Sequence, residues 1–221
     1  MKQPAAATRP NALERALAAR DRKALAALTS PPAIQAFLDA LPYSTDLSYR
    51  GPRAVLADRR AHCFDGALFG AAALRRLGHR PRIVDLLPAE GRDDDHLLAL
   101  FQRDGRWGAV AKSNFVGLRY REPVYRGLRE LAMSYFEVYY NLEREKTLRA
   151  YTAPLDLSAF DRLGWEARDG EPLEAIARRL DELRRFPLLP PEQAGDLALV
   201  DELSARAGML GTDPEGLFRP S

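Results

Sequence analysis

Helical spacing of apolar residues opens the chain. Residues 11–28 place apolar side chains at intervals of three and four, which predicts an amphipathic helix. Asn11 is the expected N-cap of this helix, and Glu14 completes a capping box. A pair of prolines interrupts the pattern, and a second, shorter helix is expected over residues 34–41. Residues 1–10 are expected to form a flexible tail.

The longest apolar stretch lies further along, over residues 61–77 (AHCFDGALFGAAALRRL). Apolar residues occupy most sides of the predicted helix, so we expect it to be buried. Gly78, which follows it, is typical of the residue after a helix end. Small residues recur every three or four positions of this predicted helix, and such a stripe lets a helix lie close against a sheet. The small residues are Gly66, Ala67, Gly70 and Ala71.

Strand patterns follow this helix. Residues 82–87 form a short run rich in branched residues, and two more apolar runs, 96–103 and 106–112, flank Asp104-Gly105. An Asp-Gly pair between apolar runs predicts a two-residue hairpin loop. In that hairpin Arg103 lies opposite Arg106.

The last part of the chain returns to helical patterns. A helix is expected over residues 123–141, a strand over 148–157, and two charged amphipathic helices over 171–186 and 192–207. The order of elements lacks the strand–helix alternation of a parallel sheet and therefore predicts an α+β fold. We expect an α+β domain over residues 11–186. A C-terminal helical extension, residues 187–221, is expected to pack on the same domain.

Composition excludes several classes of protein. Of 221 residues, 46% are hydrophobic and the net charge is +2, which argues against a disordered chain. No basic stripe is interleaved with aromatic residues, so nucleic acid is not an expected partner. The chain has neither an apolar run long enough to span a membrane nor the apolar core of a secretory signal. One cysteine excludes an internal disulfide, and we expect a cytoplasmic protein with no membrane partner.

The lone cysteine is the first candidate for chemistry. Cys63 stands at the predicted start of the buried helix, where the helix dipole and unpaired N–H groups favour a thiolate and can stabilise an oxyanion. A thiol nucleophile needs a base, and the chain has three histidines. His62 is adjacent but points elsewhere on the helix, and His79 lies in an exposed turn. His96 opens the first hairpin strand, which is a rigid place for a base.

These residues carry a resemblance. The segments AHCFDGALFGAAALRRLGHRPRIV and DDDHLLALFQRDGRWGAV resemble the core of the transglutaminase-like superfamily, over residues 61–114. The resemblance implies a papain-like α+β fold with Cys63 as nucleophile and His96 as general base. It also implies a third residue, usually Asp, four positions beyond the tryptophan. Here that position is Ala111.

The hairpin suggests substitutes for the missing carboxylate. With Arg103 opposite Arg106, His96 faces Ser113, and both side chains lie on one side of the sheet. A bulge would bring Asn114 to that side instead, and an asparagine can orient a catalytic histidine. Asp85, on the neighbouring predicted strand, is a more distant alternative.

Two functions remain open at this stage. The first is thiol-dependent acyl transfer, or hydrolysis of an amide or peptide-like substrate, without an organic cofactor. Of the two outcomes, the resemblance favours hydrolysis over cross-linking. The second is a binding module that has lost catalysis, with Ala111 as the mark of that loss. The acidic run Asp93-Asp94-Asp95 beside His96 matches no closed zinc site, so no metal is expected.

Overall fold

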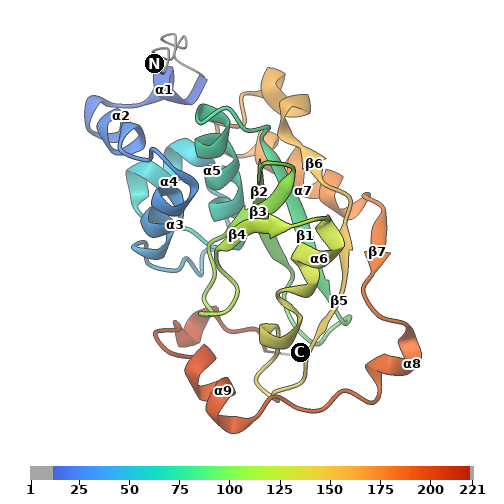
Figure 1. The fold of residues 1–221 in the computed structure, drawn as a ribbon. Helices are drawn as coiled ribbons and strands as arrows, with labels where there is room; N and C mark the ends of the chain where they lie inside the picture. Colours follow the sequence, from blue (N-terminus) through green and yellow to red (C-terminus); the bar gives the residue numbers. More distant parts are fainter. Residues whose placement is uncertain (1–11, 220–221) are drawn as a thin grey trace.

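The computed structural model describes residues 12–219 (Figure 1). The expected tail and the expected cap Asn11 lie outside these residues. In the described part, seven strands form one antiparallel sheet in the order β4-β3-β2-β1-β5-β7, and β6 also pairs with β1. The strands are β1 (Arg82–Pro88), β2 (His96–Arg103), β3 (Arg106–Val110), β4 (Arg121–Tyr125), β5 (Leu148–Thr152), β6 (Leu155–Asp156) and β7 (Arg185–Pro187).

Helices cover both faces of the sheet. One face packs against the first five helices and α7, and Figure 1 shows α1 to α5 gathered on one side of the sheet. The other face packs against α6 and a cluster of aromatic side chains. The helices are α1 (Ala12–Ala16), α2 (Ala19–Ala26), α3 (Pro31–Asp39), α4 (Pro52–Asp58), α5 (Cys63–Arg76), α6 (Leu128–Met133), α7 (Glu171–Asp181), α8 (Pro191–Ala194) and α9 (Glu202–Gly208), with short 3-10 helices η1 (Phe136–Val138), η2 (Leu157–Leu163) and η3 (Pro214–Gly216). The chain is therefore an α+β protein, as its sequence predicts.

Helix α5 lies against the sheet along its small-residue stripe. A Cβ at Gly66 would stand 2.2 Å from the Cβ of Lys112, and a Cβ at Gly70 would stand 2.9 Å from Val110. Both distances are shorter than real carbon contacts, so α5 approaches the strands only because these positions lack side chains. The expected close packing is confirmed, and it fixes the start of α5 beside the start of β2.

The hairpin forms with the predicted register. Asp104 and Gly105 adopt positive φ angles of 51° and 72°, as a tight two-residue turn requires. Arg103 pairs with Arg106, and Ala99 pairs with Val110. The ladder ends at Val110, before Lys112.

The expected helix over residues 123–141 is wrong. Arg121–Tyr125 is the edge strand β4, and only α6 and η1 are helical in the rest of that range. An edge strand tolerates Pro123 because one side of its backbone makes no ladder bonds. Three aromatic residues in and beside η1 are buried against the sheet: Tyr135, Phe136 and Tyr139.

Other boundaries shift as well. The first predicted helix divides into α1 and α2, the predicted strand 148–157 divides into β5 and β6, and the last predicted helix divides into α8 and α9. The predicted helix 171–186 ends at Asp181, because Phe186 joins the sheet in β7 and stacks on Tyr151 with ring centroids 5.3 Å apart. The expected domain boundary at residues 186 and 187 thus falls inside a strand. No described helix is long and apolar enough to cross a membrane.

Candidate functional site

Cys63 is the first residue of α5, and its neighbours hold the helix start in place. The His62 ring accepts a hydrogen bond from the Phe64 N–H at 3.2 Å. The buried Asp65 carboxylate accepts one from the His62 N–H at 3.3 Å. The two bonds form a capping box, so His62 serves the helix end. His79 lies beyond the other end of α5 and packs against Phe101, partly buried.

His96 is the first residue of β2, and its ring is buried. Its Nε2 lies 2.7 Å from the backbone carbonyl oxygen of Leu118. A carbonyl oxygen only accepts hydrogen bonds, so Nε2 carries the proton and Nδ1 keeps a free lone pair. Burial lowers the pKa of His96 to about 4, the bond to Leu118 opposes this, and the charge of Arg121 adds to it. The imidazole is therefore neutral near pH 7.

The fold brings the predicted site residues together. Cys63, His96, Ser113 and Asn114 all line one cavity of about 40 Å³. They come from the start of α5, the start of β2 and the loop that follows β3. The cavity lies at the end of the sheet, where no ladder bonds occupy the backbone beyond Val110.

The hydrogen bonds of Ser113 and Asn114 within the described chain go to partners other than His96. The Ser113 hydroxyl accepts from the Phe115 N–H at 3.0 Å. The Asn114 side chain bonds to the backbone of Asp213 and Gly216. The backbone of Leu118 therefore orients the imidazole in place of a third side chain.

Asp85, the more distant alternative, lies on β1 beside the start of β2. Its carboxyl is buried and shares a side-chain hydrogen bond with the carboxyl of Asp95. Burial raises the pKa of Asp85 well above its usual value, and the charge of Asp95 raises it further. A hydrogen bond from the backbone N–H of His96 works in the other direction. Asp85 thus contacts His96 through the backbone.

The electrostatic surroundings keep Cys63 in the thiol form. Burial raises the pKa of Cys63 above its usual value, and the charges of Asp95 and Asp85 raise it further. Hydrogen bonds from the backbone N–H groups of Leu97 and Phe64 oppose these effects. The helix start supplies the expected N–H groups, but they do not outweigh the loss of water. In this state the site pairs a neutral thiol with a neutral imidazole.

Two residues of the hairpin end have structural partners. Ala111, where the resemblance implied a carboxylate, is bound through its backbone by the Gln35 amide, with N–O distances of 2.8 and 3.0 Å. Lys112 is buried, and its ammonium group donates to the carbonyl oxygens of Leu38 and Leu41 at the end of α3. Burial lowers the pKa of Lys112 to about 8. Lys112 is thus neither a solvated surface charge nor open to an anionic substrate.

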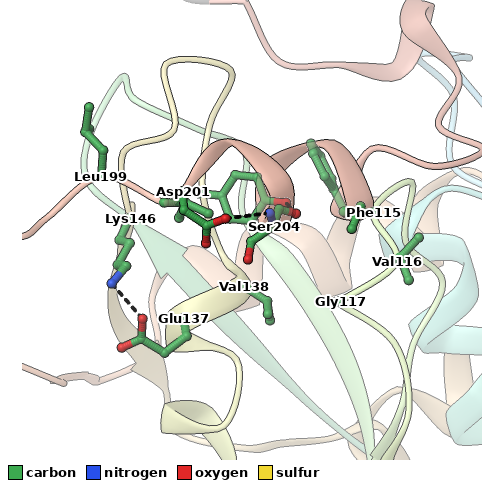
Figure 2. A pocket seen from close by; sticks show the side chains of 13 residues that line it. Phe115, Val116, Gly117, Glu137, Val138, Lys146, Leu199, Asp201 and Ser204 are labelled. Atoms are coloured by element: carbon green, nitrogen blue, oxygen red, sulfur yellow. Dashed lines mark hydrogen bonds and ion pairs between the residues drawn. The ribbon is translucent and has the colours of Figure 1, made fainter.

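A larger pocket of about 540 Å³ adjoins the first one (Figure 2). Phe115 and Tyr140 line both cavities, and their rings meet edge to face with centroids 6.4 Å apart. The larger pocket is lined mainly by apolar side chains between α9 and η1. Figure 2 shows Lys146 and Glu137 pointing toward each other at its edge, where they form an ion pair at 2.6 Å.

Sequence reasoning missed several residues around Cys63. Leu118 acts through a backbone carbonyl, which no side-chain pattern reveals. Tyr43, Gly216 and Phe218 line the cavity from segments remote in sequence. No family model matches the chain, and no curated protein matches it in sequence.

Proposed function

We propose that the protein catalyses thiol-dependent acyl transfer, or hydrolysis of an amide or peptide-like substrate, at a transglutaminase-like Cys63–His96 site. The observation that carries the proposal is the shared cavity. A potential nucleophile lines it together with an imidazole whose Nε2 is held by Leu118 and whose Nδ1 is free to accept a proton. In the papain-like arrangement a side chain holds this nitrogen, and here a backbone carbonyl takes that role.

The proposed reaction begins from the neutral pair. The Cys63 sulfur forms a bond to the acyl carbon while its proton passes to His96. The leaving group departs with that proton and leaves a thioester on Cys63. Water or an amine then attacks the thioester, gives a proton to His96, and the proton returns to the sulfur as the acyl product leaves. The proposal assigns stabilisation of the oxyanion formed in each step to backbone N–H groups at the start of α5.

The test is the pH dependence of Cys63 alkylation by iodoacetamide in the wild type and in His96→Ala. Base assistance by a neutral His96 predicts a wild-type rate that changes little between about pH 5 and pH 8. Without the base, the rate follows thiolate formation and rises about ten-fold per pH unit. Identical profiles in the two proteins would contradict the proposal.

Acylation gives a second readout of the same chemistry. Incubation with p-nitrophenyl acetate should release nitrophenol and add one acetyl group to Cys63, detected by intact mass. Cys63→Ser is the control for acetylation elsewhere, because the chain has one cysteine. Loss of the acetyl adduct in His96→Ala, with the fold retained, is the expected result.

A binding module is the second candidate function. Ala111 at the usual carboxylate position and the apolar pocket beneath α9 favour it. If Cys63 accepts no acetyl group and its alkylation is independent of His96, the binding module becomes the better explanation of the fold.

A further inference from the structure

The cavity of Cys63 and His96 is covered by a segment remote in sequence, Asp213–Arg219, hereafter the covering segment. Gly216 and Phe218 of this segment line the cavity. The remaining volume of about 40 Å³ holds roughly one water molecule and has no room for an amide substrate. Cys63 itself is partly exposed, but an amide substrate needs more room than the cavity leaves, so access of a substrate to the thiol requires this segment to move.

Asn114 binds the covering segment through all of its side-chain polar atoms. Its Oδ1 accepts from the Asp213 N–H at 2.8 Å. Its Nδ2 donates to the carbonyl oxygens of Asp213 at 2.9 Å and of Gly216 at 3.1 Å. The side chain of Asn114 therefore binds the covering segment and not His96, whose ring is bound by the Leu118 carbonyl oxygen.

Gly216 allows the covering segment to approach this closely. A Cβ at Gly216 would lie 2.7 Å from the Tyr43 ring and 3.1 Å from Asn114 Nδ2. Tyr43 lines the cavity and is partly buried, so the surrounding side chains limit how far its ring can retreat. Any larger residue at position 216 must lift the segment or distort the cavity wall.

The chain before the covering segment is lightly packed. Between Asp201 and Arg219, Ala205 is the one buried hydrophobic side chain of the described structure. Leu203 and Leu210 are exposed by 75% and 70%. Segments with few buried apolar contacts open at a low free-energy cost, so polar anchors such as Asn114 decide whether this one stays in place.

We propose that the covering segment regulates access to Cys63: it closes the cavity in the resting protein and must leave before a substrate reaches the thiol. The inference rests on the proposed function, since it concerns the same site. It also explains the neutral thiol, because withdrawal of the segment admits water and removes part of the burial that raises the pKa of Cys63.

The test compares iodoacetamide alkylation of the full chain with that of Gly216→Val. Gly195→Val is the matched control, because a Cβ at Gly195 meets nothing within 4 Å and its φ of −76° suits any residue. Hydrogen exchange over residues 213–218 follows the segment itself. We expect the variant to react about ten-fold faster or more, with faster exchange in this segment, and the control to match the wild type.

Two results would overturn the proposal. One is faster exchange in Gly216→Val with an unchanged alkylation rate, since the segment would then move without exposing Cys63. The other is no change in either measurement, since the close approach of Gly216 to Tyr43 and Asn114, from which the cover is inferred, would then be absent. Neither depends on catalysis. Fast alkylation of Gly216→Val without any acetyl transfer would support the role of the covering segment and contradict only the proposed function.

Discussion

The α5–sheet core and the region after Leu188 are stabilised in different ways. Every residue of α5 from Phe64 to Leu74 is buried, and the strands beneath it are buried with it. By contrast, α8 has no buried residue and α9 has one, Ala205. The core is therefore stabilised by burial of much apolar surface, whereas the later region is held by one small cluster (Tyr140, Val200 and Ala205) and by a few hydrogen bonds, including those from Tyr140 and Asn114.

This difference separates chemistry from access. Cys63 and His96 belong to elements that the core fixes, so their relative position is stable. The residues that close the cavity belong to the lightly packed region. A change in the core should alter the global free energy of unfolding, whereas a change in the later region should alter local opening.

The largest expected contrast comes from truncating one leucine in each region. Leu68→Ala removes a fully buried side chain from α5 and should lower the free energy of unfolding by about 2–5 kcal/mol. Leu203→Ala removes an exposed side chain from α9 and should change it by less than about 0.5 kcal/mol. Urea unfolding of both variants measures the two values. Equal losses of unfolding free energy in the two variants would show that apolar burial stabilises both regions to a similar extent.

The pH dependence of stability tests the burial of His96, which lines the cavity between the two regions. His96 has a folded pKa of about 4 against a usual 6.5, so between these values the unfolded chain binds a proton that the folded chain does not. Wild-type stability should therefore fall as pH drops through this window, by up to about 3 kcal/mol relative to His96→Gln.

Urea unfolding of the wild type and His96→Gln at pH 7 and pH 4 measures that difference. Other titrating groups, including His62 and Asp65, are present in both proteins and cancel in the comparison. His79→Gln is the control, because His79 is only partly buried and should give a smaller pH-dependent difference. A pH-independent difference between wild type and His96→Gln would mean that His96 is hydrated.

Two glycines give the next contrast. A Cβ at Gly66 would stand 2.2 Å from Lys112 Cβ, in a buried side chain whose ammonium group is anchored at the end of α3, so Gly66→Ala should destabilise the protein by about 1–3 kcal/mol. A Cβ at Gly208 would stand 1.9 Å from the Tyr140 hydroxyl, at the tip of a side chain beneath the lightly packed α9. Gly208→Ala should therefore speed hydrogen exchange in α9 and leave the melting temperature almost unchanged. An equal fall in melting temperature would place α9 in the cooperative core.

The same division explains how much of the fold the sequence predicts. The buried helix, the hairpin and its register follow from local patterns: a stripe of small residues, an Asp-Gly turn and alternating strands. The helix expected over residues 123–141 fails because its aromatic residues suit a helix and a strand alike, and pairing with β3 decides between them. Short elements such as α8 and β7 depend on tertiary contacts, which spacing alone does not encode.

The candidate site divides in the same manner. The sequence places Cys63 and His96 at the starts of two elements, so these two residues could be brought together from pattern alone. The predicted pairing of His96 with Ser113 does not form, because the ladder ends at Val110, and Ser113 reaches the cavity from the loop after β3. The role of Leu118 could not be predicted, because it uses a backbone carbonyl. The hydrogen bond between Asp213 and Asn114 could not be predicted either, because ninety-nine positions separate the two residues.

The smallest contrast concerns single hydroxyl groups. The Tyr140 hydroxyl donates to the carbonyl oxygens of Ser204 at 3.1 Å and Ala205 at 3.3 Å, and so ties α9 to the segment between η1 and β5. Tyr140→Phe keeps the ring against Phe115 and removes only these bonds. We expect a local cost of about 1 kcal/mol, seen as faster hydrogen exchange in α9 with little change in the urea midpoint.

Tyr135→Phe is the matched variant in the core. The Tyr135 hydroxyl donates to the Arg119 carbonyl oxygen at 2.7 Å, and its ring is fully buried against the sheet. Its removal should lower the global free energy of unfolding by about 1 kcal/mol, because this contact breaks only when the core unfolds. If Tyr140→Phe instead lowers the urea midpoint as much as Tyr135→Phe, α9 unfolds together with the sheet. The cover over Cys63 would then be as stable as the site beneath it, and access to the thiol would require global unfolding.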